Sequence, residues 1–265
     1  MCGLAGSLFP ERRDPPSSLQ DVRQMIQAQK HRGPDGQGYW GADSGRVFLG
    51  HCRLAIIDLS PAGHQPMASR DGRYVICFNG EIYNYLELKQ ELQKDGVLFR
   101  GHSDTEVLLE GIARWGMDQA LHKMVGMFAL ALWDNLDNRL FLARDRAGKK
   151  PLYYHKTRAA LHFASEHKAF KVLPAVGLTY DEVSIYHYLT FGYVPAPRTI
   201  YQEVAEVPAG HYLEVSSGLD VAVKSYWRPD WSGQRRMGFA AAVEETERLL
   251  QDAVRIRLRA DVPVG

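Results

Sequence analysis

The chain has 265 residues, of which 45% are hydrophobic and 24% are charged, and its formal net charge is +1. This composition is typical of a globular protein, and the near-zero charge gives no electrostatic basis for binding nucleic acid or an anionic membrane surface. The apolar runs are too short to cross a bilayer. The three cysteines and ten histidines lack the spacing of metal ligands, which favours reduced thiols, a cytoplasmic location and no bound metal.

Along residues 1–215, short apolar runs alternate with Gly, Pro and Asn turns, which predicts strands. The predicted strands are 46–50, 53–57, 74–78, 127–133, 139–143, 151–154 and 160–164. Helical periodicity predicts helices over 19–30 and 83–94, and a capping box at residues 103–106 begins a third helix that Gly116 ends. Many strands with few helices indicate an α+β fold in which two sheets pack face to face with helices outside them.

The sequence pattern changes after residue 215. Residues 216–238 are predicted to be a linker, because they precede a long segment of different character. Residues 239–258 form one Glu- and Arg-rich amphipathic pattern that is typical of a helix. We therefore expect three parts, covering residues 2–215, 216–238 and 239–265.

The chain starts with Met1-Cys2-Gly3. A cysteine at position 2 fits chance, an acylation site or a core thiol. It also fits a catalytic group, because removal of Met1 would leave Cys2 with both a thiol and a free α-amine, a nucleophile with its own base. Cys52 and Cys77 lie within apolar strand patterns and are interpreted as core thiols.

A second motif, Phe78-Asn79-Gly80, follows an apolar run. An Asn-Gly pair by itself is typical of a hairpin turn. Because helical periodicity follows here, we interpret the motif as a strand-to-helix corner that presents the Asn79 amide and the Gly80 N–H side by side. Two such donors suit the oxyanion that develops during acyl transfer.

Two charged residues stand out by their positions. Arg53 enters a strongly apolar strand pattern, where it either faces solvent or grips a carboxylate through two parallel N–H bonds. Asp104 lies in the first turn of a predicted helix, where it stabilises the helix and can also receive a substrate ammonium group.

Taken in order, the motifs of this chain resemble the N-terminal glutaminase domain of glutamine-hydrolysing asparagine synthetases. That domain is a class II glutamine amidotransferase of the N-terminal-nucleophile hydrolase type. The residues that carry the resemblance are Met1-Cys-Gly3, His31-Arg-Gly-Pro-Asp35, Arg53-Leu-Ala-Ile-Ile-Asp58, Phe78-Asn-Gly-Glu-Ile-Tyr-Asn84, Ser103-Asp-Thr-Glu106 and the run 143–154.

The resemblance implies an αββα sandwich over residues 2–215 and, over residues 239–265, the start of an α/β synthetase domain of the ATP-pyrophosphatase type, ending before its phosphate loop. It also implies that Cys2 attacks the side-chain amide of L-glutamine and forms a thioester. Asn79 and Gly80 would hold the oxyanion, and the products would be glutamate and ammonia.

The resemblance further implies how glutamine is recognised. Arg53 would bind the α-carboxylate, and Asp104 with Glu81 would bind the α-ammonium group. Leu54, Ile56 and Ile57 would complete the pocket by analogy with the family.

The glutaminase reaction needs no cofactor and no metal, whereas the missing synthetase domain would use Mg-ATP. The expected partners are L-glutamine and a synthetase domain in the same chain, and a homodimer is left open. The full-length reaction would convert ATP, aspartate and glutamine to asparagine, glutamate, AMP and diphosphate, while the present chain alone is expected to be a glutaminase. The alternatives are a different carboxylate acceptor, hydrolysis of another amide, and a catalytically silent interaction domain.

Overall fold

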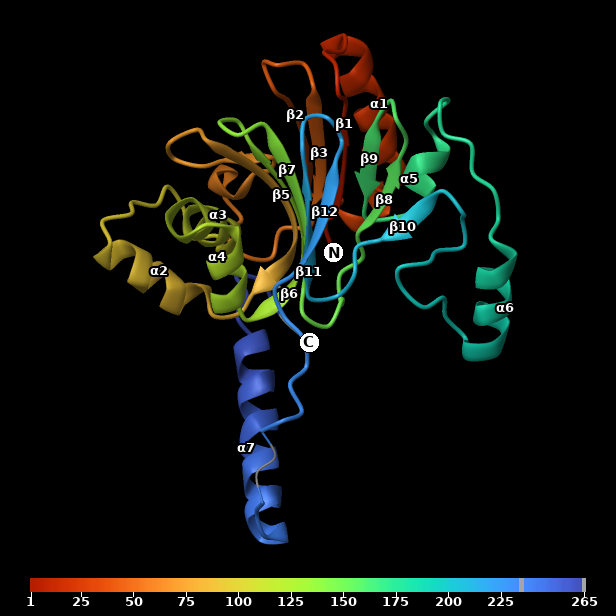
Figure 1. Ribbon diagram of the computed structural model, residues 1–265. Coiled ribbons are helices and arrows are strands. Elements are labelled where there is room, and N and C mark those ends of the chain that lie inside the picture. The colour runs from red at the N-terminus through yellow and green to blue at the C-terminus, as the bar shows by residue number, and fades with distance from the viewer. Residues whose placement is uncertain (234–235, 264–265) are drawn as a thin grey trace.

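The computed structural model describes residues 1–233 and 236–263 (Figure 1). Within these residues the strands form two six-stranded sheets, and each pairing is antiparallel. The first sheet has the order β10-β8-β9-β1-β3-β2, with β1 (Gly3–Leu8), β2 (Gly36–Gly41), β3 (Val47–Arg53), β8 (Tyr153–Lys156), β9 (Leu161–Ala164) and β10 (Val204–Glu206). The second has the order β12-β11-β7-β6-β5-β4, with β4 (Met67–Ala68), β5 (Tyr74–Ile82), β6 (Gly126–Asp134), β7 (Arg139–Arg144), β11 (His211–Val215) and β12 (Val221–Ser225).

Helices cover the outer faces of both sheets. On the first sheet lie α1 (Pro15–Ala28) and α5 (Lys168–Lys171), and on the second lie α2 (Tyr85–Lys94), α3 (Asp104–Trp115) and α4 (Met117–Lys123). Two further helices, α6 (Glu182–Phe191) and α7 (Phe239–Arg257), extend away from the sandwich (Figure 1). The predicted α+β fold with two face-to-face sheets and flanking helices is confirmed.

The central core lies between the two sheets. Leu4 and Leu49 from the first sheet pack there with Ala131, Trp133 and Leu142 from the second. The outer face of each sheet is buried under its helices in a separate cluster. Because both faces of β6 are covered, its sequence is continuously apolar instead of alternating with polar residues.

Two local predictions differ from the structure. The strand expected over residues 53–57 ends at Arg53, and an irregular loop follows in which Asp58 has a φ of 57°. The expected strand-to-helix corner at Asn79 and Gly80 is wrong, because both residues lie inside β5 and pair with β6. Pairing along the whole length of β5 outweighs the local turn preference of Asn-Gly.

The second sheet also continues past residue 215. Its edge strand β12 pairs with β11 inside the segment expected to be a linker. Directly after it, the buried side chain of Tyr226 donates its O–H to the carbonyl oxygen of Arg144 at 2.8 Å. The sandwich therefore extends through Tyr226.

The last long helix, α7, is different in character. None of its described residues is buried, and Phe239, Val243, Leu250 and Val254 are exposed along it. That residues 239–265 begin a separate domain stays a prediction. Across the described ranges, no helix combines the length and apolar character needed to cross a membrane.

Candidate active site

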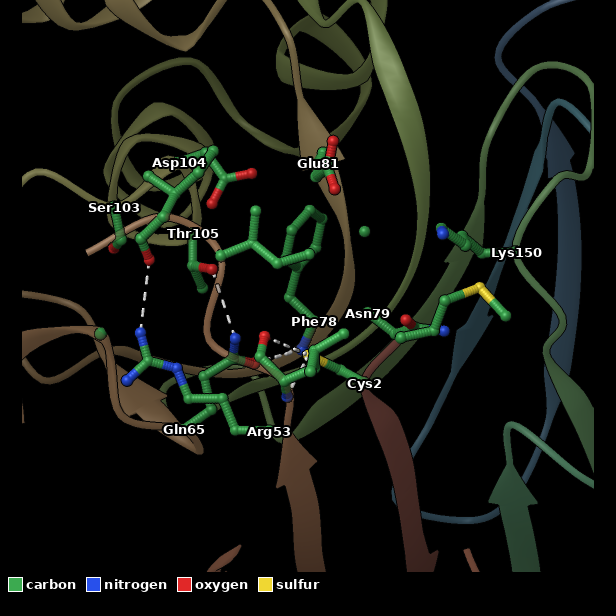
Figure 2. A pocket seen from close by; sticks show the side chains of 16 residues that line it. Cys2, Arg53, Gln65, Phe78, Asn79, Glu81, Ser103, Asp104, Thr105 and Lys150 are labelled. Atoms are coloured by element: carbon green, nitrogen blue, oxygen red, sulfur yellow. Dashed lines mark hydrogen bonds between the residues drawn. The ribbon is translucent and has the colours of Figure 1, made fainter. Parts of the chain in front are cut away.

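One pocket brings together the residues that the sequence suggested (Figure 2). It encloses about 550 Å³ of empty space, part of it open to solvent. All nine predicted site residues line it, namely Cys2, Arg53, Leu54, Ile56, Ile57, Asn79, Gly80, Glu81 and Asp104. Figure 2 shows Asp104 and Glu81 at one end of the pocket and Cys2 with Asn79 toward the other.

The start of β1 fixes the position of Cys2. Its carbonyl oxygen accepts a hydrogen bond from Nε of the buried Arg32 at 2.9 Å, and Arg32 is itself held by an ion pair with Glu166 at 2.9 Å. Gly3 follows because a side chain has no room there: a Cβ would lie 2.8 Å from Cys52 Sγ. The Cys-Gly start thus lets β1 run close against β3 and delivers the thiol to the pocket.

Protonation at Cys2 is set by burial and by one backbone group. Burial raises the pKa of the Cys2 thiol, while the Leu54 N–H, 3.3 Å from Sγ, opposes this shift because it favours the thiolate. Burial also lowers the pKa of the amine at Met1, which itself lines the pocket. A thiol that stays protonated needs a base before it can act as a nucleophile.

Asn79 is the clearest oxyanion-hole candidate. Its side chain is buried, with 1% of its surface exposed. Neither its Nδ2 nor its Oδ1 has a hydrogen-bond partner within the described part of the chain. Because burying an unpaired amide is costly, such a group indicates a ligand that completes it.

Gly80 presents its backbone N–H on the pocket side of β5. In a strand, backbone N–H groups two residues apart point to the same side. On this side the Phe78 N–H donates to Gln65 Oε1 at 2.6 Å and the Ile82 N–H donates to Asp104 Oδ2 at 2.9 Å. The N–H of Gly80 lies between them, beyond the point where the short strand β4 stops pairing with β5.

Glycine is required at position 80 because β6 passes directly behind it. A Cβ there would lie 2.3 Å from the carbonyl oxygen of Met127 and 2.7 Å from Cα of Phe128. Glycine at this position therefore lets β5 run close against β6 beside the pocket.

Asp104 begins α3 at the other end of the pocket. Ser103 caps the helix by accepting the Glu106 N–H at 3.2 Å, as the predicted capping box requires. Burial raises the pKa of Asp104 to about 7, and the hydrogen bond from the Ile82 N–H partly opposes the shift. Burial likewise raises the pKa of Glu81, with Lys150 opposing it.

Arg53 lies at the end of β3, where its guanidinium folds onto the following loop. Nη1 donates to the carbonyl oxygen of Ser60 at 3.3 Å, and Nη2 donates to the carbonyl oxygens of Ile57, at 3.3 Å, and Asp58. The guanidinium therefore lines the pocket, but its N–H groups already donate to carbonyl oxygens of the loop that follows Arg53. A substrate carboxylate would have to replace some of these carbonyl contacts.

Sequence reasoning gave no role to several residues that also line the pocket. Besides Met1 these are Gly63, Gln65, Phe78, Ser103, Thr105 and Lys150. Gln65 joins two walls, because its Oε1 accepts the Phe78 N–H and its Nε2 donates to Thr105 Oγ1 at 3.3 Å. Lys150 had a signal, since it lies in the 143–154 run, whereas nothing local distinguishes Gln65.

A buried carboxylate places Lys150 at the pocket. Oδ1 of Asp145 accepts the N–H groups of Ala147 and Lys149, both at 3.0 Å, and Oδ2 accepts that of Lys150 at 3.1 Å. Burial lowers the pKa of the Lys150 ammonium. The loop is thus wound around Asp145, and its cation is held inside the protein.

The other two cysteines are core thiols, as expected. Cys52 and Cys77 are fully buried and unpaired. Burial raises the pKa of Cys52 to about 11 and also raises that of Cys77. Neither lines the pocket, so Cys2 is its sole thiol among the described residues.

The αββα sandwich carries Cys2, just before its first strand, into a polar pocket. Among solved structures, the chain is similar to the glutamine phosphoribosylpyrophosphate amidotransferase of Bacillus subtilis, with a TM-score of 0.65 over 86% of this chain and 50% of that one. At 22% identity this likeness shows the fold alone.

Sequence comparison gives the family. Residues 1–227 match the glutamine amidotransferase domain family, and the chain belongs to it. The chain is 36% identical over 267 residues to asparagine synthetase [glutamine-hydrolyzing] 1 of Bacillus subtilis, covering all of this chain and 41% of the relative. It is also 34% identical over 276 residues to amidase chry2 of Gibberella zeae, covering all of this chain and 40% of that protein. The chain thus spans about two fifths of the length of these curated relatives.

Proposed function

We propose that this glutamine amidotransferase domain hydrolyses L-glutamine at Cys2 and supplies the ammonia to an asparagine-forming synthetase domain. The observation that carries the proposal is the arrangement of the pocket. A thiol and an unpartnered buried amide lie toward one end, and a buried carboxylate lies at the other. Glutamine has the matching groups, with a side-chain amide at one end and an ammonium group at the other.

The reaction begins once Met1 has been removed. The free α-amine of Cys2 takes the thiol proton, and the thiolate attacks the amide carbon of glutamine. Asn79 Nδ2 and the Gly80 N–H stabilise the oxyanion of the tetrahedral intermediate. The resulting α-ammonium protonates the departing ammonia, and a thioester forms at Sγ. Water then attacks the thioester carbonyl, which releases glutamate and regenerates the thiol.

Recognition of the amino-acid head group takes place at the opposite end. Arg53 binds the α-carboxylate, and Asp104 binds the α-ammonium with Glu81 close to it. Leu54, Ile56 and Ile57 shape the wall between them. An ordinary peptide or a simple amide would offer no oppositely charged group to Arg53 and Asp104, so the pocket selects the free amino acid.

The acceptor is proposed from the relatives. Those named asparagine synthetases support aspartate as the acceptor. We propose that a further domain activates it with Mg-ATP. The relative named amidase chry2 favours a second candidate, hydrolysis of another amide. The glutaminase half needs no cofactor. We place the enzyme in the cytoplasm because all three cysteines are free thiols. Whether the chain forms a homodimer can be checked by light scattering.

Covalent labelling tests the function. The full chain with Met1 removed is treated with 6-diazo-5-oxo-norleucine, a glutamine analogue, and its intact mass is measured. One adduct is expected in the wild type and in Cys52→Ala, and none in Cys2→Ala. Glutamine should protect against labelling, whereas glutamine with a blocked α-amine should not. Absence of an adduct would favour a silent interaction domain, and full activity with an N-terminal tag would exclude the α-amine as the base.

A further inference from the structure

After α7 the chain contacts the sandwich again, outside the pocket. Figure 1 shows that the C-terminal end of this helix is the end nearer to the sandwich, and the residues after it contact α2. Beyond it, Arg259 forms an ion pair with Glu87 on α2 at 2.7 Å and donates to the carbonyl oxygen of Tyr83, just after β5. Arg257 also lies over the Tyr83 ring, 4.8 Å from its centroid. These contacts hold the segment against the residues that directly follow β5, the strand that carries Asn79 and Gly80.

Asp261 makes the contacts nearest to the pocket. Its N–H donates to the carbonyl oxygen of Ile56 at 2.9 Å. Its Oδ2 accepts the Asp58 N–H at 2.7 Å and lies 2.8 Å from Nε2 of His102. One residue of the tail therefore binds three groups in two separate loops.

Those two loops carry the proposed head-group ligands. The first follows Arg53, and its Ile57 and Asp58 carbonyl oxygens hold the Arg53 guanidinium. The second contains His102, two residues before Asp104. The loops also contact each other, because the His102 N–H donates to Asp58 Oδ2 at 2.9 Å. From outside the pocket, Asp261 thus connects the loop that holds the Arg53 guanidinium with the loop that precedes Asp104.

Asp261 is held in these contacts as a carboxylate. Its hydrogen bond from the Asp58 N–H, followed by that with His102, lowers the pKa of Asp261. Charge-assisted bonds of this kind are stronger than neutral ones, and a carboxylate shared by two donors fixes the distance between them.

We propose that residues 259–261 form a strap that positions the glutamine pocket, with Asp261 as the positioning residue. Asp261 touches neither the pocket interior nor the substrate. It acts through the loops that carry Arg53 and Asp104, so it controls glutamine binding more than the chemistry at Cys2. The proposal rests on the proposed glutaminase function. It also makes the tail a mechanical link, because a shift of residues 259–261 would change the separation of the two head-group ligands.

Kinetics of the full chain, with Met1 removed, test the strap. Asp261→Ala removes the shared carboxylate, and we expect KM for glutamine to rise about tenfold, with kcat within about twofold of the wild type. Asp261→Asn keeps one oxygen acceptor and should give an intermediate KM. The matched control is Asp95→Ala at the end of α2, which loses an exposed ion pair with Arg114 and should leave KM unchanged.

Hydrogen–deuterium exchange provides a second readout that does not depend on activity. Asp261→Ala should speed exchange at residues 54–60 and 100–103 and leave β6 unchanged. An unchanged KM or unchanged exchange in these loops would overturn the strap, as would a loss confined to kcat. If Asp261→Ala fails to fold, Asp261→Asn decides. If the wild type hydrolyses no glutamine, the proposed function fails and the exchange result alone judges the strap.

Discussion

The two ends of the pocket are built differently. The reaction end rests on strands: Cys2 directly precedes β1, and Asn79 and Gly80 lie within β5. Both strands are inside their sheets, with β1 between β9 and β3, and β5 paired with β6 along its whole length. At the recognition end, Glu81 also lies in β5, but Arg53 is the last residue of β3 with its guanidinium held by the following loop, and Asp104 is the first residue of α3.

This difference has a consequence for function. Ladder hydrogen bonds and a core on both faces fix the reaction end, whereas side-chain contacts and the tail hold the recognition end. Elements with fewer ladder bonds open at lower free-energy cost. Substitutions at the strand-borne end should therefore change kcat, and those at the loop-borne end should change KM.

The largest effect is expected at the reaction end. Asn79→Ala removes one oxyanion donor, so kcat should fall about 10²- to 10³-fold with little change in KM. The control is Asn84→Ala, because Asn84 lies outside the pocket and its Nδ2 donates to the carbonyl oxygen of Lys123. That variant should lose stability but keep kcat. Steady-state ammonia release measures both, and a rise in KM at unchanged kcat would remove Asn79 from the oxyanion hole.

A pH-dependent effect is expected at the recognition end. Burial raises the pKa of Asp104 to about 7, so the carboxyl group is largely neutral below that pH and loses its attraction for an ammonium group. KM should therefore rise as pH falls through 7, by at most about tenfold per pH unit, while Asp104→Asn should give a high KM that does not vary with pH. A pH-independent KM in the wild type would contradict this assignment.

Asp104→Asn should weaken glutamine binding but stabilise the folded protein. Because the pKa of Asp104 is higher in the folded than in the unfolded chain, ionisation destabilises the folded state as pH rises from the ordinary carboxyl range through about 7. Asp104→Asn avoids that cost and keeps an oxygen for the Ile82 N–H. At pH 8 its free energy of unfolding should exceed that of the wild type, as measured by urea denaturation.

Much of this fold follows from local sequence. The apolar run over 127–133 and the capping box at Ser103 gave β6 and the start of α3, because periodicity and capping are local properties. The Asn79-Gly80 corner was wrong because a long-range pairing decides that backbone. Gln65 was missed for the same reason, since its partners Phe78 and Thr105 come from distant parts of the chain.

The site was predicted by resemblance more than by local physics. The motifs gave nine residues, and folding brings all nine to one pocket. No local pattern shows that Asp261 contacts Asp58, because these residues are 203 positions apart and their contact depends on where α7 ends. The hydrogen bonds from the Arg53 guanidinium to its own loop could not be predicted either, because they depend on the path of a loop that was expected to be a strand.

The smallest effect is expected for a substitution of Arg53. In the free protein, Arg53 already donates to three loop carbonyl oxygens. Glutamine binding therefore gains only the difference in free energy between these hydrogen bonds and those to the α-carboxylate. Arg53→Lys keeps the charge but loses the two parallel donors, and KM should rise about three- to tenfold with kcat nearly unchanged.

Arg73→Lys is the matched control for Arg53→Lys, because Arg73 makes a forked contact with Asp134 outside the pocket, with Nε and Nη2 at 3.1 and 2.7 Å from Oδ2. It should lower the melting temperature and leave KM unchanged.

If Asp261 acts through the Arg53 loop, the double variant Arg53→Lys/Asp261→Ala should raise KM by less than the product of the two single effects. Independent, multiplicative effects would instead mean that the strap supports only the Asp104 side of the pocket.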